Sequence, residues 1–304
     1  MFELAHYAAW HFKCRFMGKR MPLQSVVFIT SYCNLQCKHC AIAKLVAEGQ
    51  IKREHFPLSK VKDLLKQCYD AGSRMVTFEG GEPLMWRDGD YDLEHLVKEA
   101  RNMGFFSTSY STNGTLPIPN SSTDRIFVSL DGTKEYHDAI RGEGNFDLTM
   151  KNIAESAYPH ISVNFVANKI NWECVSDVVE LTAKTKNIKG ISINFHTPHG
   201  GTEDMFLPWD KRRQVVDKVI KLKKEGYPII NSTAGLKRLR DNNYTKRCWI
   251  TDFVLPDGKR HPQCFGAEEG ICDKCGYGMG AEMSALYDLS PSTIIEGLKL
   301  FSKV

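Results

Sequence analysis

The sequence predicts an α/β fold in which short strands alternate with amphipathic helices. Six β-branched or aromatic runs recur at intervals of a few tens of residues, as expected of strands. They are Val26–Thr30, Met75–Phe78, Phe106–Tyr110, Ile126–Leu130, Ile161–Val166 and Ile191–Phe195. Segments with helical spacing of apolar residues separate most of these runs, and such alternation is typical of a parallel sheet with helical connections. The pattern predicts an α/β barrel or an open α/β sheet.

The helices are predicted from their apolar periodicity. Four of them lie between predicted strands, at Leu58–Asp70, Leu93–Asn102, Leu148–Ser156 and Cys174–Lys184. A fifth amphipathic helix, Lys211–Lys224, follows the last predicted strand. Beyond Cys248 the chain is rich in Gly and Cys, and the Pro256-Asp257-Gly258 turn between two extended runs predicts a hairpin. A closing helix over Pro291–Phe301 is expected from its capping Ser290 and its first-position proline.

These elements divide the chain into three expected units. Residues 1–22 form an amphipathic N-terminal helix, residues 23–235 form the βα-repeat domain, and residues 236–304 form a small Cys-rich α+β domain with the closing helix.

The composition bounds the class of protein. The chain has 304 residues, of which 42% are hydrophobic and 25% charged, as in soluble globular proteins. A net charge of +4 is too small for a dedicated nucleic-acid binder, so we expect no nucleic-acid partner. The uncharged stretch 102–123 carries too many polar residues to span a membrane. Because Glu3 precedes the apolar N-terminal residues and the basic ones follow them, we expect no secretory signal and a cytoplasmic location.

A cysteine triplet follows the first predicted strand directly. Cys33, Cys37 and Cys40 have CxxxCxxC spacing on a strand-to-helix loop. Thiolate ligands select iron–sulfur clusters, copper(I) or zinc, and three of them would leave one iron of a cubane cluster open to a substrate or cofactor. A zinc knuckle that uses His39 as the fourth ligand is the alternative.

With this triplet, the chain resembles the radical S-adenosylmethionine (radical SAM) superfamily. In that family three cysteines hold a 4Fe-4S cluster, and the methionine amino and carboxylate groups of SAM chelate its fourth iron. Gly80-Gly81-Glu82, after the second predicted strand, matches the GGE motif that binds the SAM amino group. Glycine permits close backbone approach there, and Glu82 supplies an anionic acceptor. The resemblance implies a partial (β/α)6 TIM-like barrel with SAM and a 4Fe-4S cluster as cofactors.

Further cofactor-binding positions lie at or after later strand ends, where small polar side chains can bond ribose hydroxyls and the SAM carboxylate. They are Ser111, Asn113, Ser129, Asp131, Arg141 and Asn164. Arg141 is a candidate clamp for a carboxylate, because guanidinium presents a bidentate fork. Ordinary turn residues and a solvated surface arginine are the alternatives.

A second cysteine set surrounds the predicted hairpin. Its members, spaced C-x15-C-x7-C-x2-C, are Cys248, Cys264, Cys272 and Cys275. The pattern is similar to the auxiliary-cluster modules called twitch domains, relatives of SPASM domains, and implies a second 4Fe-4S cluster. Four thiolates would leave no iron open, which suits an electron relay or a structural staple. A structural zinc ribbon is the alternative. The other three cysteines lack such spacing and are expected to be small buried hydrophobic residues.

The resemblance implies an enzyme that reductively cleaves SAM to a 5′-deoxyadenosyl radical, which abstracts hydrogen from a substrate or adds to it. We expect Tyr110 and His196 to be catalytic, with Thr197 and His199 also facing the substrate, because these residues lie at or just after predicted strand ends. A low-potential electron donor such as ferredoxin or flavodoxin is an implied partner. Peptide modification or alcohol dehydrogenation with the auxiliary cluster is the alternative, followed by a non-enzymatic cluster or zinc protein.

The barrel region also resembles the branch that contains adenosylhopane synthase, which implies an isoprenoid lipid or small-molecule substrate. The matching segments are residues 15–20, Ser129-Leu130-Asp131-Gly132, Tyr136-His137-Asp138 and Asn231-Ser232-Thr233. The C-terminal cysteine set departs from that enzyme. An independent indication is the N-terminal helix, which is apolar around much of its girth and basic toward its end. It either contacts an anionic membrane through residues 1–20, making the protein membrane-peripheral, or packs across the bottom of the barrel.

Overall fold

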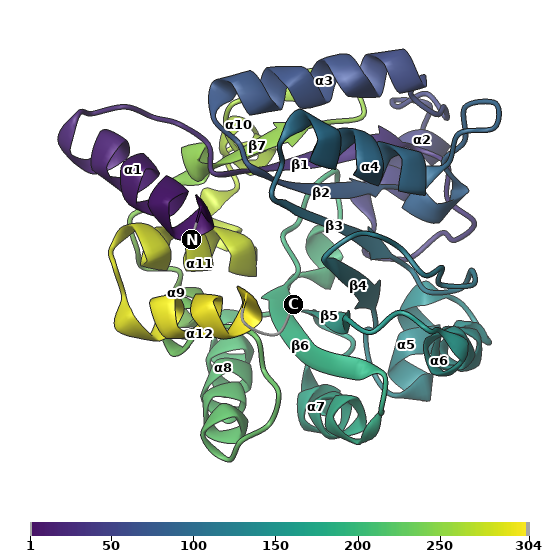
Figure 1. The fold of residues 1–304 in the computed structure, drawn as a ribbon. Coiled ribbons are helices and arrows are strands. Elements are labelled where there is room, and N and C mark those ends of the chain that lie inside the picture. The colour runs from purple at the N-terminus through teal and green to yellow at the C-terminus, as the bar shows by residue number, and fades with distance from the viewer. Residues whose placement is uncertain (1, 302–304) are drawn as a thin grey trace.

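The chain folds into a curved, mostly parallel sheet, and the structure, a computed structural model, describes residues 2–301 (Figure 1). Within these residues one sheet has the strand order β6-β5-β4-β3-β2-β1-β7-β8. The strands are β1 Gln24–Thr30, β2 Met75–Gly80, β3 Ser107–Thr112, β4 Arg125–Ser129, β5 Ile161–Ala167, β6 Ile188–Phe195, β7 Thr251–Val254 and β8 Arg260–His261. Only β8 pairs in the antiparallel sense, with β7. The predicted α/β fold is confirmed.

Helices connect the strands and cover the outside of the curved sheet (Figure 1). The α-helices are α1 Phe2–Phe16, α2 Ala41–Ala47, α3 Leu58–Ala71, α4 Leu93–Met103, α5 Lys134–Arg141, α6 Asn145–Glu155, α7 Val175–Lys184, α8 Trp209–Lys224, α9 Thr233–Asp241, α10 Phe265–Glu268, α11 Gly278–Tyr287 and α12 Pro291–Phe301. Short 3-10 helices are η1 Pro83–Met85, η2 Trp172–Cys174, η3 Glu203–Met205, η4 Cys248–Ile250 and η5 Cys272–Lys274. Each of the six helices predicted outside the N-terminal segment is present.

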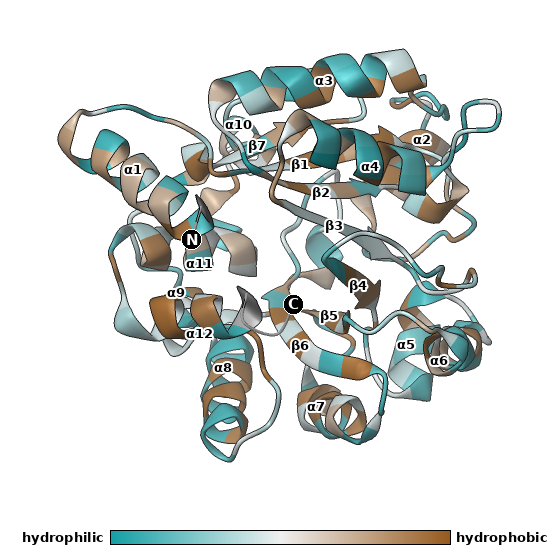
Figure 2. Cartoon of the chain, in the orientation of Figure 1, coloured by the Kyte–Doolittle hydropathy of each residue, from teal (hydrophilic) through white to brown (hydrophobic). Residues whose placement is uncertain are grey.

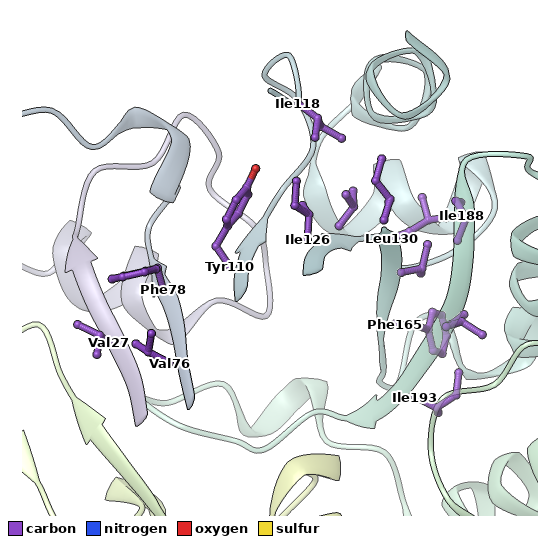
Figure 3. Packing of buried hydrophobic residues seen from close by; sticks show 14 of the residues in the cluster. Val27, Val76, Phe78, Tyr110, Ile118, Ile126, Leu130, Phe165, Ile188 and Ile193 are labelled. Carbon is purple, nitrogen blue, oxygen red and sulfur yellow. The ribbon is translucent and has the colours of Figure 1, made fainter. Parts of the chain in front are cut away.

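The core lies between the outer face of the sheet and these helices. Along β3 the residues at even positions, including Tyr110, are buried under the helices, whereas Ser107, Ser109 and Ser111 face the other way. This alternation is the period of two that a strand imposes on its side chains. Figure 3 shows the buried apolar side chains of successive strands in one continuous cluster. Figure 2 shows the same segregation, with a hydrophobic β4 in the sheet and a largely hydrophilic α4 on the outside.

The C-terminal region continues the barrel. The predicted hairpin forms β7 and β8, and β7 joins the sheet beside β1. Beyond β6, Phe195 N donates to Gly276 O at 2.9 Å, which attaches the segment before α11 to the last barrel strand. The expected division at 235/236 falls inside α9, whose Leu236 and Leu239 belong to the barrel's core. A separate unit over residues 236–304 therefore stays a proposal, and residues 302–304 lie outside the described residues.

The N-terminal helix packs against the C-terminal region through one stripe. Trp10 and Cys14 are buried in a small cluster with Ile250, and Tyr287 Oη donates to Cys14 O at 3.3 Å. The helix predicted over residues 1–22 spans Phe2–Phe16, and Met1 lies outside the described residues. Among the described residues, no helix is both long enough and apolar enough to cross a membrane.

Candidate functional site

A cavity of about 1800 Å³ occupies the interior of the barrel. Its wall is built from the inward-facing side chains of the strands and from the loops at their carboxyl ends. Predicted site residues that line it are Cys33, Cys37, Cys40, Gly80, Gly81, Ser111, Asn113, Ser129, Arg141, Asn164, His196, Thr197 and His199. In parallel α/β folds the carboxyl ends of the strands carry the binding loops, so the cavity lies where such a fold places its chemistry.

The three cysteines of the triplet lie together on this wall. The backbone N–H of Leu35 donates to Cys33 Sγ and that of Ala43 donates to Cys40 Sγ, each at 3.4 Å. Cys40 is also the N-cap of α2, so its sulfur faces the positive end of a helix. Burial raises the pKa of Cys37 to about 11, so a metal would have to displace the thiol proton. Amide donors to sulfur are a feature of iron–sulfur sites, and the triplet fits such a cluster.

The described residues hold no group of three or more His, Cys, Asp or Glu side chains arranged around a single metal ion. His39, the fourth ligand of the alternative zinc knuckle, places its Nε2 at 3.6 Å from Asp131 Oδ2. Burial lowers the pKa of His39 to about 4, so its imidazole is neutral.

Gly80 and Gly81 bring the second strand against the cysteine loop. Gly81 N donates to Thr30 O at 2.8 Å. A Cβ on Gly80 would lie 2.3 Å from Thr30 O, and one on Gly81 would lie 2.1 Å from Tyr32 O. Gly80 also has φ of +155°, a conformation that side chains rarely adopt. Only glycine fits both positions, and the exposed backbone forms the cavity wall beside Cys33.

Glu82 has a different position from the one that the resemblance implies. Its carboxylate accepts hydrogen bonds from Leu84 N at 3.0 Å, Thr112 Oγ1 at 2.8 Å and Asn113 N at 2.7 Å. The residue is fully buried and does not line the cavity. In this arrangement Glu82 positions the loop after β3, and the cavity-facing part of the motif is the backbone of Gly80 and Gly81.

Arg141 and Asp131 form a buried ion pair at the carboxyl end of β4. Arg141 Nε donates to Asp131 Oδ2 at 2.7 Å, and Arg141 Nη1 donates to Cys37 Sγ at 3.8 Å. Burial alone would raise the pKa of Asp131, but the Arg141 guanidinium, His39, His137 and the hydrogen bond from Val166 N together outweigh burial and lower that pKa, which keeps the carboxylate ionised. Arg141 lines the cavity and Asp131 does not. Asp131 thus positions the guanidinium, and Arg141 offers it to a ligand beside the cysteine triplet.

The remaining predicted cofactor contacts form a polar layer around the cavity. Asn113 Nδ2 donates to Cys33 Sγ at 3.8 Å, so the loop after β3 contacts the cysteine loop directly. Asn164 Oδ1 accepts from Asn194 Nδ2 at 2.6 Å, and Ser129 lies on the same wall. These side chains place hydroxyl and amide groups along one side of the cavity.

Glu79 lines the cavity, and sequence reasoning missed it. It stands directly before Gly80, and its Oε1 accepts from Ser111 Oγ at 3.2 Å. Burial raises the pKa of Glu79. The signal that could have found it is the period of two along β2, because Met75, Thr77 and Glu79 all face the cavity.

Tyr110 does not face the cavity, contrary to the expectation from its position at a strand end. It is buried on the helix-facing side of β3, among the apolar side chains that Figure 3 shows, and it does not line the cavity. Its hydroxyl has no hydrogen-bond partner among the described residues. The strand end was predicted well, but the face on which residue 110 falls was not.

Tyr110→Phe tests this correction. Because the substitution removes a buried hydroxyl that lacks a partner, we expect SAM cleavage to stay within about twofold of the wild type and the unfolding midpoint to stay equal or rise. Measuring both in one preparation checks the assignment. A loss of cleavage in a protein of unchanged stability would return Tyr110 to the site.

The histidines after β6 are held by neighbouring groups. His196 Nε2 lies 2.9 Å from Thr202 Oγ1, and burial lowers the pKa of His196. Thr197 Oγ1 accepts from Gly276 N at 2.8 Å. His199 Nδ1 lies 2.5 Å from Glu269 Oε2. All three predicted substrate-facing residues line the cavity, but each has a structural partner, and none is singled out as an acid or base.

The C-terminal cysteines lie together outside the cavity wall. Cys248 and Cys264 are hydrogen-bonded to each other; this bond lowers the pKa of Cys248 to about 7 and raises that of Cys264. Cys272 and Cys275 are close enough to respond to the charge of Cys248. All four are half-buried, and none of them lines the cavity. This placement fits a closed site better than a substrate-binding one.

Glu282 on the cavity wall predicts how stability depends on pH. Burial raises the pKa of Glu282 to about 7 from an ordinary 4.5, although Ser232 N and Oγ donate to it. The folded chain therefore binds a proton that the unfolded chain has released between those values, so stability falls as pH rises from about 4.5 through about 7. At about 1.4 kcal/mol per pKa unit, the loss is on the order of 3 kcal/mol.

Urea unfolding at about pH 5 and about pH 8 measures this loss, and Glu282→Gln should abolish most of it while keeping an acceptor for Ser232 N. An equal loss in the wild type and the variant would assign the pH dependence to other groups.

Comparison with known proteins agrees with this geometry. The family model described as the radical SAM superfamily matches residues 27–182. Fe-coproporphyrin III synthase of Methanosarcina barkeri is 31% identical over 222 residues, which cover 66% of this chain and 52% of that protein. Mycofactocin maturase MftC of Mycobacterium tuberculosis is 28% identical over 182 residues, which cover 55% of this chain and 43% of MftC. The chain thus spans about half the length of these relatives.

Solved structures support the fold. Streptococcus suis SuiB bound to S-adenosylmethionine superposes with a TM-score of 0.63 at 18% identity, covering 90% of this chain and 67% of SuiB. Native anSMEcpe with bound AdoMet gives a TM-score of 0.57 at 18% identity, and the match covers 90% of this chain and 82% of anSMEcpe. The family match extends over half of the sequence and contains the triplet, the paired glycines and Arg141. The chain is an enzyme of the radical SAM superfamily.

Proposed function

We propose that the chain cleaves SAM reductively at a 4Fe-4S cluster on Cys33, Cys37 and Cys40, and applies the resulting radical to a substrate held in the barrel cavity. The observation that carries this proposal is the meeting of three thiols, the backbone of Gly80–Gly81 and the Arg141 guanidinium on one wall. When bound, the cluster and SAM supply a 5′-deoxyadenosyl radical that abstracts hydrogen or adds to an alkene. The protein supplies binding, orientation and exclusion of water.

The chain's own residues would hold the two ends of SAM. Arg141, fixed by Asp131, is placed to bind the methionine carboxylate with its charged fork. The carbonyl groups of Gly80 and Gly81 can approach the ammonium, because no side chain intervenes. Ser129 and Asn164 are placed to bond the ribose hydroxyls. We assign Asn113, which donates to Cys33 Sγ, to positioning the cysteine loop.

For the substrate we propose an isoprenoid lipid or a small molecule with a large apolar part. The volume of the cavity supports a ligand of this size, and its wall includes apolar side chains such as Phe28, Phe127 and Met283. A peptide or an alcohol is the second candidate, favoured by the C-terminal cysteine set beside the cavity and by the similarity to a mycofactocin maturase.

We propose that the C-terminal cysteines hold a second 4Fe-4S cluster that accepts or relays an electron, with structural zinc as the alternative. His199 and Phe265, whose ring centroids lie 4.2 Å apart, line the cavity close to Cys264 and would separate this cluster from the substrate. Further proposed partners are a low-potential donor such as ferredoxin or flavodoxin, and a membrane contacted peripherally through residues 1–20 on its cytoplasmic side.

The substrate class is tested under anaerobic, reducing conditions with SAM and the reconstituted enzyme. A C30 isoprenoid alkene in micelles, a secondary alcohol and an unstructured peptide are added separately. We expect the alkene to raise the rate of SAM consumption at least about tenfold over the substrate-free rate, with a product identified by mass spectrometry. Stimulation by the alcohol or the peptide alone would select the second candidate.

A further inference from the structure

One end of the barrel is surrounded by exposed apolar side chains. Phe12 and Phe16 on α1 are 57% and 72% exposed, and Leu298 on α12 is 47% exposed. Other large apolar residues exposed on the same segments are Leu4, Met17, Leu289 and Ile295. In the view of Figure 1, α11 lies between α1 and α12, and Figure 2 shows hydrophobic residues recurring along α12. We call these seven residues the apolar rim.

Most of the apolar rim contributes to the wall of the cavity that holds the cysteine triplet. Leu4, Phe12, Phe16, Leu289 and Leu298 line the same cavity as Cys33, Cys37 and Cys40. Between the two groups the wall is formed by residues at the amino ends of the strands, namely Gln24, Met75, Ser107 and Arg125. The cavity therefore runs through the barrel from the cysteine end to the rim.

One side of α1 packs against the C-terminal region, and the side that carries the rim residues stays exposed. Trp10 and Cys14 are buried, and His11 Nε2 lies 3.0 Å from Tyr287 O. Phe12 and Phe16, on another side of the helix, are exposed and lie with ring centroids 5.4 Å apart. The sequence-based alternatives of core packing and an exposed apolar face thus apply to two different stripes of the same helix.

The charges next to the rim indicate what covers it. Lys13, Arg15, Lys19 and Arg20 are all exposed at the end of α1 and after it, and Glu3 is the only acidic residue among residues 1–22. Aromatic and aliphatic side chains flanked by basic ones are typical of helices that lie in the headgroup region of an anionic bilayer. A protein partner would have to be both apolar and acidic over the same small area, whereas an anionic lipid surface offers both properties.

We propose that the apolar rim docks on an anionic lipid bilayer and that the substrate, an amphiphile with a long apolar chain, enters the barrel there, at the amino ends of the strands. Docking extends the membrane contact proposed above for residues 1–20 to α12 and does not depend on SAM cleavage, whereas the entry of substrate rests on the proposed function. An amphiphile could then pass from the bilayer into the cavity without exposing its chain to water, with its reacting part directed toward the cysteine triplet.

Docking is tested by co-sedimentation of the full chain with vesicles of phosphatidylcholine alone or mixed with phosphatidylglycerol. We expect binding to the anionic vesicles, at least about tenfold weaker binding after Phe12→Glu or Leu298→Glu, and a similar loss in high salt. The matched control is Leu148→Glu, because Leu148 is 41% exposed on α6, away from the rim, and this variant should bind like the wild type.

Two outcomes would overturn docking. The first is a co-sedimentation result in which the wild-type chain does not bind the anionic vesicles, or in which the rim variants bind them as well as Leu148→Glu does. The second is a dimer in light scattering that Phe12→Glu dissociates, since a second copy would then cover the rim. Vesicle binding by a chain that does not cleave SAM would refute the proposed function and leave docking intact, and cleavage without vesicle binding would do the reverse.

Entry through the rim is tested with a fluorescent polyene fatty acid as the probe. Gly297 lines the cavity at the rim, and a Cβ there would meet nothing within 4 Å, so Gly297→Phe can narrow the opening without strain. We expect the variant to bind the probe at least about fivefold more slowly or more weakly, and Leu148→Glu to match the wild type. Equal probe binding in all three proteins would place the entrance elsewhere.

Discussion

Replacing Cys37 with Ala should abolish reductive cleavage of SAM, lowering the rate by at least about 1000-fold, which corresponds to roughly 4 kcal/mol in the barrier. Cys37 is one of three thiols on the cavity wall and lies beside the Arg141 guanidinium. Without it, two thiolates would have to hold the cluster, and the charge next to Arg141 would be lost. The assay is production of 5′-deoxyadenosine under a reductant, with iron counted in the same sample.

Cys68→Ala is the matched control for this variant. Cys68 is buried in α3 outside the cavity, and its removal leaves only a small void, at a cost of about 1 kcal/mol. This variant should keep both its iron and its cleavage activity. Cleavage that survives in Cys37→Ala, or that is lost equally in Cys68→Ala, would show that the triplet is not the reactive site.

Gly81→Ala should weaken SAM binding at least about 100-fold, although it adds only one methyl group. The new Cβ would lie 2.1 Å from Tyr32 O and 3.0 Å from Cys33 Cβ, so the cysteine loop would have to move away from β2. Such a shift separates the triplet from the backbone that is proposed to receive the SAM ammonium. Equilibrium dialysis with radiolabelled SAM measures the effect on the reconstituted enzyme.

Gly280→Ala, in α11, provides the comparison. Its added Cβ would lie 3.6 Å from its nearest neighbour, Tyr244 Oη, which is an ordinary van der Waals distance. We expect it to bind SAM like the wild type. Unimpaired binding by Gly81→Ala would mean that the contact between the glycine pair and the cysteine loop does not shape the SAM site.

The sequence predicted the alternation of strands and helices well, because each strand carries its own apolar run. It did not predict α5, Lys134–Arg141, in which only His137, Ile140 and Arg141 are buried. Only one of these three buried residues, Ile140, is apolar, so the helix lacks an apolar run in its sequence and owes its position to tertiary contacts such as Arg141 with Asp131. It also did not predict that β7 would pair with β1, because a four-residue strand carries little information about its partner.

At the site, the sequence placed residues that are marked by spacing, and it failed where orientation decides. The triplet and the paired glycines can be recognised from their spacing in the sequence. The roles of Tyr110 and Glu82 depend instead on the direction in which each side chain points from the backbone. Tyr110 points under the helices, and Glu82 is enclosed by three donors. Glu79 is the converse case, because no motif marks it and only its place in the period of two along β2 directs its side chain into the cavity.

The central claim is that the wall formed by Cys33, Cys37 and Cys40 is a SAM-cleaving site in a chain that binds two clusters. Its most direct test is anaerobic reconstitution of the wild-type chain with iron and sulfide, followed by iron counting and a reductant-dependent assay for 5′-deoxyadenosine. We expect about eight irons per chain, four per cluster, together with cleavage of SAM. Zinc in place of iron, with no cleavage of SAM, would contradict it.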